Sequence, residues 1–128
     1  MADERPVGGV PADSAEALFR ASPIPTIVHD PQTGAVLDAN DACEDLFGYD
    51  RDTLVDMNVA EFSAVEDAAS EAKAAFEATN REGAFELDWE IERPDATQTE
   101  VHVQLRQATL DGSDVVLAYV TDVSTNRK

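Results

Sequence analysis

Basic residues are few in this sequence, and lysine is nearly missing. Lys73 and Lys128 are the only lysines among 9 basic residues, which stand against 27 acidic residues, and the formal net charge is −18. Such a charge repels nucleic acid and anionic membrane surfaces, so neither is an expected partner. Near 1 M salt the Debye length falls to about 3 Å and screens the repulsion among carboxylates. The composition is typical of proteins from organisms that accumulate molar salt, with an ordinary acidic protein as the alternative.

Paired cysteines and long apolar stretches are also missing. Cys43 is the single cysteine, so an intramolecular disulfide is excluded. No apolar run reaches the roughly 18 residues of a membrane span, and residues 1–5 lack the basic and then apolar order of a secretory signal. We therefore expect a cytoplasmic protein with no membrane insertion by this segment. Its 43% of apolar residues is enough to fill one core of one domain.

Proline and glycine near the N-terminus set the expected domain limits. Residues 1–12 are rich in both and poor in large apolar groups, which predicts a flexible leader. We expect the domain over residues 13–124 and the start of a C-terminal linker over residues 125–128. The first element of the domain is a short amphipathic helix over residues 13–21, which ends before Pro23.

The next part of the chain predicts a β-hairpin followed by short helices. Asp-Pro-Gln-Thr-Gly supplies the turn of the hairpin. Asn40 and Asp50 are placed to cap the two helices, and Gly48 is placed as the left-handed stop of the first. The expected elements are strands over residues 26–29 and 35–38 and helices over residues 41–47 and 51–55.

The period of the apolar residues changes once in the second half. Ser63 and Glu66 form a capping-box pattern, and apolar residues then recur at helical spacing from Val65 to Asn80. Beyond Gly83 the period becomes two, which is typical of strands with one buried face. The predicted strands cover residues 85–92, 101–106 and 115–121, and the last is apolar on both faces, as a central strand would be.

The order of these elements predicts an α+β fold. The first two strands form a hairpin, and the last three have connections short enough for an antiparallel meander. One antiparallel sheet of five strands, with the helices packed on one face, follows from this order.

Five local features in this order and at this spacing resemble the PAS domain, a sensory module, over about residues 14–126. The features are Ser22–Pro25 before a strand, Thr33–Gly34, Asn40, Phe47–Tyr49 and the closing Asp122–Ser124. One departure is Asp95–Ala96, which replaces the frequent Asp-Gly hairpin of the family and leaves the turn type open.

The resemblance implies a five-stranded antiparallel sheet with helices over one face and a small central cavity. It also implies an input module of a histidine kinase, transducer or transcription regulator, here from a halophilic archaeal signalling protein. Asp122 and Ser124 are the expected relay to the downstream linker, because Asp122 can accept hydrogen bonds at the strand end and Ser124 can cap a following helix. The alternative is that they are turn residues at a frayed end.

Several apolar side chains are candidates for the lining of a ligand pocket. An alanine-rich helix either approaches the sheet closely or leaves a void, so the same residues line a pocket for an unidentified small molecule or fill the core. Cys43 lies on an apolar helix face, where a cysteine is commonly part of the core. The candidates are Cys43, Phe47, Phe76, Trp89, Val103 and Tyr119.

No cofactor or metal is predicted. Flavin is disfavoured because Cys43 does not lie in the Asn-Cys-Arg-Phe run of the flavin-binding relatives, and haem is disfavoured because the long helix has no histidine. His29 and His102 favour surface or supporting roles, since two isolated histidines make a poor metal site. The acidic strand positions 86, 88, 90 and 92 favour a solvated face over a calcium site or a docking surface.

The leading functional hypothesis is a non-enzymatic sensor that acts on a downstream signalling domain or protein. One alternative is a small cone-shaped enzyme with a buried carboxylate, which the outward placement of nearly every acidic residue disfavours. Another is a scaffold with a filled core that only dimerises. We expect a homodimer, with Leu18 and Phe19 on the first helix packing against a second copy.

Overall fold

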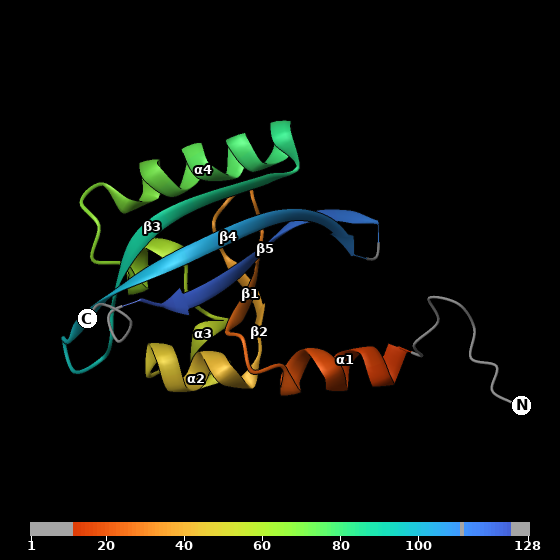
Figure 1. Cartoon of the computed structure of the whole chain (residues 1–128), viewed down its shortest axis with the longest axis horizontal. Helices are drawn as coiled ribbons and strands as arrows, with labels where there is room; N and C mark the ends of the chain where they lie inside the picture. The colour runs from red at the N-terminus through yellow and green to blue at the C-terminus, as the bar shows by residue number, and fades with distance from the viewer. Residues whose placement is uncertain (1–11, 111, 124–128) are drawn as a thin grey trace, which may run out of the picture.

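The computed structural model describes residues 12–110 and 112–123 of the chain, with an N-terminal helix, a five-stranded sheet and further helices (Figure 1). The helices are α1 (Ala12–Ala21), α2 (Asp41–Phe47), α3 (Arg51–Leu54), the 3-10 turn η1 (Val59–Phe62) and α4 (Ala68–Glu82). The strands are β1 (Thr26–His29), β2 (Val36–Ala39), β3 (Ala84–Glu92), β4 (Gln98–Leu110) and β5 (Ser113–Asp122). Residues 1–11 of the expected leader, the expected linker and Ser124 lie outside the described residues.

The five strands form one antiparallel sheet in the order β2-β1-β5-β4-β3. The predicted α+β class, the first hairpin and the closing meander are therefore confirmed. β5 lies in the middle of the sheet, as its apolar residues on both faces predicted. Such a strand packs on both sides and has no free edge.

Alternation along the strands separates an inner face that meets the helices from an outer face. In β5, Val116, Ala118 and Val120 belong to the hydrophobic core, and their neighbours point the other way because successive side chains alternate. The core residues of β4, Val101 and Val103 among them, share this inner face. The inner face is the side on which a cavity can form.

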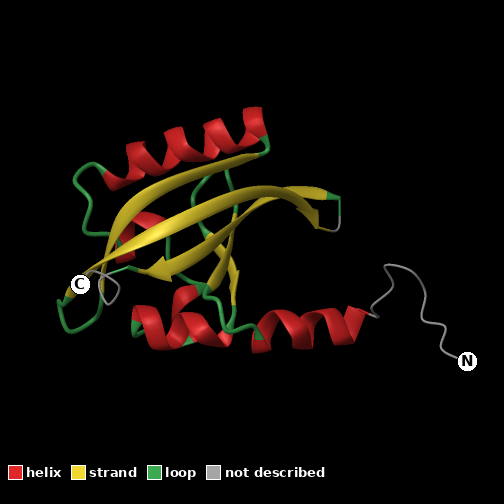
Figure 2. Ribbon diagram, viewed as in Figure 1, coloured by secondary structure: helices red, strands yellow, loops and turns green. Residues whose placement is uncertain are grey.

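The helices pack at different ends of the sheet (Figure 2). α4 runs along β3 and also contacts η1 and β4, whereas α1 contacts α2 near the hairpin of β1 and β2. Leu46, Phe47 and Leu54 from α2 and α3 join the same core as α4. The core therefore lies between the inner face of the sheet and the segment from α2 to α4.

The predicted start of the long helix is wrong. α4 begins at Ala68, after Asp67 in the left-handed conformation with φ of 59°, and not in a capping box of Ser63 and Glu66. Ser63 instead forms an isolated β-bridge with Ile91, which removes it from the helix. The capping box in this region belongs to η1, where the side chains of Asn58 and Glu61 bond each other's backbone N–H groups.

The turn between β3 and β4 accommodates the alanine that replaces the usual glycine of the family. Ala96 has φ of 72° and its N–H donates to the carbonyl of Arg93. The Asp95 carboxylate accepts hydrogen bonds from the N–H and the hydroxyl of Thr97. These bonds hold Ala96 in a conformation that costs an L-residue about 1–2 kcal/mol relative to a right-handed one.

Candidate ligand cavity

A cavity of about 50 Å³ lies between α4 and the inner face of the sheet. Its wall is almost entirely apolar, and every strand except β2 contributes to it. The lining residues are Ile27, His29, Phe47, Val59, Phe62, Ala72, Ala75, Phe76, Leu87, Trp89, Ile91, Val101, Val103, Leu105, Ala118 and Val120.

Small side chains on both sides leave this space open. Ala72 and Ala75 occupy the buried face of α4, and Ala118 occupies the centre of the sheet opposite them. A methyl group at each position cannot fill the volume that a larger core residue would take. The alanine-rich helix therefore produces a void, which was one of the two outcomes that the sequence left open.

Four of the six candidate pocket residues line this cavity, namely Phe47, Phe76, Trp89 and Val103. Tyr119 does not, because it lies opposite Gln104 of β4 and Thr26 of β1 and shares their outer face. Its predicted place in the pocket is wrong.

Cys43 does not line the cavity either, because it lies on the buried face of α2. Its Sγ donates to the carbonyl of Thr26 and to Oδ1 of Asn40, each at 3.3 Å. Burial raises the pKa of Cys43 to about 12, so the thiol is protonated and weakly nucleophilic at neutral pH. Cys43 acts in packing.

His29 is the polar residue of the cavity wall, and of the surface or supporting roles expected for it, the surface role is wrong. Its side chain is 3% exposed, and its ring lies 5.2 Å from that of Phe76. Nδ1 lies 3.3 Å from the carbonyl of Gly34, which can only accept, so Nδ1 carries the proton and Nε2 is left as an acceptor. Burial lowers the pKa of His29 to about 4, so the ring is neutral at physiological pH. Alternation from Ile27, two residues earlier, was the signal that placed it inward.

The aromatic side chains around the cavity are fixed by specific contacts. Nε1 of Trp89 donates to Oγ of Ser63 at 2.7 Å, and that hydroxyl donates to the carbonyl of Val59 at 2.6 Å. The rings of Phe47 and Phe62 meet edge to face, with centroids 5.0 Å apart. The cavity wall is therefore ordered, and the polar end of Trp89 needs no partner from a ligand.

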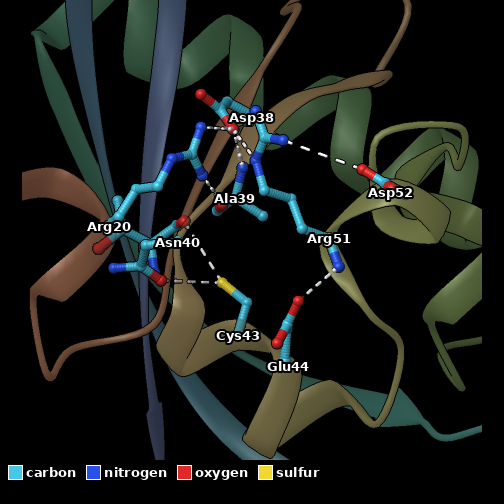
Figure 3. Close-up of polar contacts among 9 residues, drawn as sticks. Arg20, Asp38, Ala39, Asn40, Cys43, Glu44, Arg51 and Asp52 are labelled. Carbon is cyan, nitrogen blue, oxygen red and sulfur yellow. Dashed lines mark hydrogen bonds and ion pairs between the residues drawn. The ribbon is translucent and has the colours of Figure 1, made fainter. Parts of the chain in front are cut away.

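A polar cluster joins α1 to β2 and α3 (Figure 3). Oδ1 of Asp38 lies 2.9 Å from Nε of Arg51 and 3.6 Å from a guanidinium nitrogen of Arg20. Asn40 was expected to cap α2. It is the N-cap residue, but its side chain makes no capping hydrogen bond. Its amide accepts from the N–H of Thr26 at 3.0 Å and donates to the carbonyl of Ile24 at 2.8 Å, which fixes the start of β1.

Asp122, expected in the relay, and Leu18 and Phe19, expected at a dimer contact, do not line the cavity. Asp122 ends β5 opposite Val101, and the N–H of the next residue, Val123, donates to the carbonyl of Glu100 at 3.3 Å. The carboxyl end of β5 is therefore tied to β4. On α1, Leu18 is 63% exposed and Phe19 is half-buried.

The acidic positions of β3 lie on the outer face, where two of them bind a histidine. Nδ1 of His102 lies 3.0 Å from Asp88 and Nε2 lies 3.0 Å from Glu86. Hydrogen bonds to these carboxylates raise the pKa of His102. Within residues 12–110 and 112–123, no group of three His, Cys, Asp or Glu side chains is arranged to hold a metal ion. No helix in the same ranges is long and apolar enough to cross a membrane.

An antiparallel five-stranded sheet with helices over an apolar cavity defines a class of small α+β domains that enclose a site between helices and sheet. A family model described as the PAS domain matches residues 23–125. The protein belongs to the PAS domain family, whose members are typically sensory, non-catalytic modules of kinases and regulators. No curated protein matches the chain.

Solved structures of PAS domains share this fold. The PAS domain of an HTR-like protein from Haloarcula marismortui is 25% identical with a TM-score of 0.77, over 87% of this chain and 90% of that one. A PAS domain of a two-component sensor histidine kinase is 15% identical with a TM-score of 0.71, over 84% and 92% of the two chains. A PAS domain of a LuxR-family transcriptional regulator from Burkholderia thailandensis, in complex with ethanol, is 18% identical with a TM-score of 0.70, over 85% and 96%.

Proposed function

We propose that this PAS domain senses a small, mostly apolar molecule in the cavity beneath α4. The observation that carries the proposal is an apolar void whose one titratable lining residue is the neutral His29. A neutral imidazole in an apolar wall offers an acceptor at Nε2, so the preferred guest is apolar with at most one hydrogen-bond donor. No carboxylate lines the cavity, which favours binding over the acid–base chemistry of a cone-shaped enzyme.

The size of the cavity limits the guest to a few heavy atoms. An apolar cavity of about 150 Å³ binds benzene, and this one measures about 50 Å³. The PAS domain from Burkholderia thailandensis was solved in complex with ethanol, which is a molecule of the expected size. Short alcohols and similar small molecules are therefore the first ligands to test, and the small volume supports the expectation that neither flavin nor haem binds.

Transmission through β5 follows from the position of the guest. Ala118 and Val120 line the cavity and lie on the strand that ends at Asp122. A guest that shifts these side chains acts on the end of β5, because a packed strand moves as a unit. We infer that Asp122 and Ser124 relay this shift to a kinase, transducer or transcription-regulator output in the cytoplasm.

Native mass spectrometry of protein isolated from the producing cells tests the proposal. The wild-type chain is expected to retain a small added mass. Ala75→Val, which places two more carbons in the cavity, is expected to lose this mass. Ala74→Val carries the same substitution on the exposed face of α4 and is expected to retain it. A wild-type chain with no added mass, or equal retention of the mass by both variants, would favour the alternative of a dimerising scaffold that binds no ligand.

Dimerisation through α1 is a second part of the proposal, because Leu18 presents an apolar side chain that is 63% exposed. Light scattering after size exclusion in 2 M KCl measures the mass of the particle. We expect a dimer for the wild-type chain and a monomer for Leu18→Gln. A wild-type monomer, or a dimer of Leu18→Gln, counts against this interface.

We further infer adaptation to molar salt, such as that of a halophilic archaeon, from the net charge of −18. Screening of carboxylate repulsion stabilises the compact chain as the salt concentration rises. The melting temperature is expected to rise steeply between 0.1 and 3 M KCl. A melting temperature that does not change with KCl concentration would favour an ordinary acidic protein without adaptation to salt.

A further inference from the structure

A second hollow lies outside the cavity, between the turn that joins β1 to β2 and the first half of α4. It is a groove with a volume of about 180 Å³, larger than that of the cavity. The groove is lined by Pro31, Gln32, Thr33, Gly34, Asn58, Val59, Ala69, Ala72, Lys73 and Phe76.

The charge of this groove differs from that of the whole molecule. The chain has 27 acidic residues, yet none of the lining residues is acidic. Lys73 lines the groove and is the only lysine in the described part of the chain. The ion pairs of that part involve Arg20, Arg51 and His102, and none of them uses Lys73. Among the described residues, the ammonium group of Lys73 is therefore not held in an ion pair.

Further polar groups on the rim offer hydrogen bonds to an anion. The hydroxyl of Thr33 accepts from the N–H of Ala35 at 3.2 Å, so its own hydrogen remains to donate. Gln32 is exposed and contributes a carboxamide. Together with Lys73, these side chains supply three kinds of donor, and an ionised acceptor makes the stronger bond with each.

The floor of the groove is apolar. Its apolar lining residues include Val59, Ala72 and Phe76, all of which are buried. A ligand with an anionic head and a short apolar body therefore satisfies both parts, with the head at Lys73 and the body over Phe76. A bulkier polyanion would place charge against the apolar floor, which is unfavourable.

The turn that forms one wall is held in place before any ligand arrives. Nδ2 of Asn58 donates to the carbonyl of Thr33 at 2.6 Å, and the N–H of Val59 donates to the carbonyl of Gly34 at 3.0 Å. Gly34 has φ of 78°, and a Cβ there would lie 3.1 Å from a methyl carbon of Val59. A pre-formed wall lowers the entropic cost of binding.

The groove and the inner cavity share part of their walls. Val59, Ala72 and Phe76 line both, and the ring of Phe76 packs against His29 on the cavity side. A ligand seated over Phe76 therefore contacts the partition between the two spaces.

We propose that this groove binds a short-chain monocarboxylate, with the carboxylate at Lys73 and the alkyl chain over Phe76. The proposal goes beyond the sensing of a neutral guest in the cavity and does not depend on it.

Butyrate, with butyramide as its neutral counterpart, tests the groove. Two-dimensional amide NMR of the full chain follows Gly34 and Lys73 at constant ionic strength and pH 7. We expect saturable shifts with butyrate and none of comparable size with butyramide. Lys73→Gln is expected to weaken butyrate binding about tenfold or more, because a charge-assisted hydrogen bond is lost.

Two control variants distinguish binding in the groove from binding elsewhere on the protein. Arg81→Gln removes one positive charge from the exposed surface of the same helix, outside the groove, and is expected to bind butyrate as the wild type does. Ala75→Val fills the inner cavity, which Ala75 lines, but not the groove, and is also expected to bind normally. Equal binding of butyramide, an unchanged affinity of Lys73→Gln, or an equal loss in Arg81→Gln would overturn the proposal. Loss in Ala75→Val would overturn it too, because butyrate would then bind in the cavity instead.

Discussion

Replacing His29 removes a specific dependence of stability on pH. The ring is buried and neutral, with its pKa lowered from 6.5 to about 4 by the loss of solvent. Between these values the unfolded chain binds a proton that the folded chain does not, so the free energy of unfolding falls as the pH falls. From linkage, His29 alone lowers this free energy by about 2 kcal/mol on going from pH 8 to pH 5. Its favourable neutral state is fully present above about pH 6.5.

Urea unfolding at constant KCl and at several pH values between 5 and 8 measures this effect in the wild type and in His29→Gln. Carboxylates contribute to both chains and cancel in the difference. We expect the stability of the wild type relative to His29→Gln to fall by about 2 kcal/mol between pH 8 and pH 5. If the free energy of unfolding changed with pH in the same way for both chains, the claim that His29 is buried and neutral would be refuted.

His102 is the matched control, because its shift has the opposite sign. Hydrogen bonds to Asp88 and Glu86 raise its pKa, so its stabilising effect is present below about pH 6.5 and is lost as the pH rises through the folded value. His102→Gln should therefore cost more stability at pH 5 than at pH 8. If His29→Gln does not fold, NMR titration of the wild-type rings gives the same answer. Titration of His29 at or above its ordinary value contradicts the account.

Three further substitutions, each measured by urea unfolding, test the turn between β3 and β4, the ion pairs of Asp38 and the hydrogen bond of Trp89. Ala96→Gly should stabilise the domain by about 1 kcal/mol, since glycine takes the left-handed φ without strain. A loss of stability would contradict the claim that Ala96 is strained in this turn. Asp38→Asn should cost about 1 kcal/mol and speed amide exchange in α1, because its carboxylate pairs with arginines of α1 and α3; unchanged exchange would show that the pair does not hold α1. Trp89→Phe should cost about 1 kcal/mol through the lost bond to Ser63, and no loss would mean that water replaces this bond.

The strands could be predicted from the sequence because their information is local. Alternation in residues 85–92, with Phe85 and Ile91 on one side and Glu86 and Glu92 on the other, fixes both the strand and its face. The hairpin of β1 and β2 followed from its turn residues in the same way. The face on which each β5 side chain lies could not be predicted from the sequence, because β5 is apolar on both faces and shows no alternation. Tyr119 was therefore placed on the wrong face of the sheet.

Other features depend on contacts between distant segments. The Ser63 and Glu66 pattern satisfies the local rule for a helix start, but pairing with β3 recruits Ser63 to the sheet and delays α4 to Ala68. From the sequence, Lys73 is predicted only to be a polar residue on the exposed face of an amphipathic helix. It lines the groove only because the turn of residues 30–34 folds back against α4.

Xenon binding tests directly whether the space beneath α4 accepts a guest, because xenon enters dry apolar cavities. Methyl NMR under xenon pressure should shift Val103 and Val120, which line the cavity, and leave Leu117 of the outer face unchanged. Ala75→Val should abolish the shifts, and Ala74→Val should preserve them. Equal shifts on both faces of the sheet, or none at the lining valines, would contradict the account.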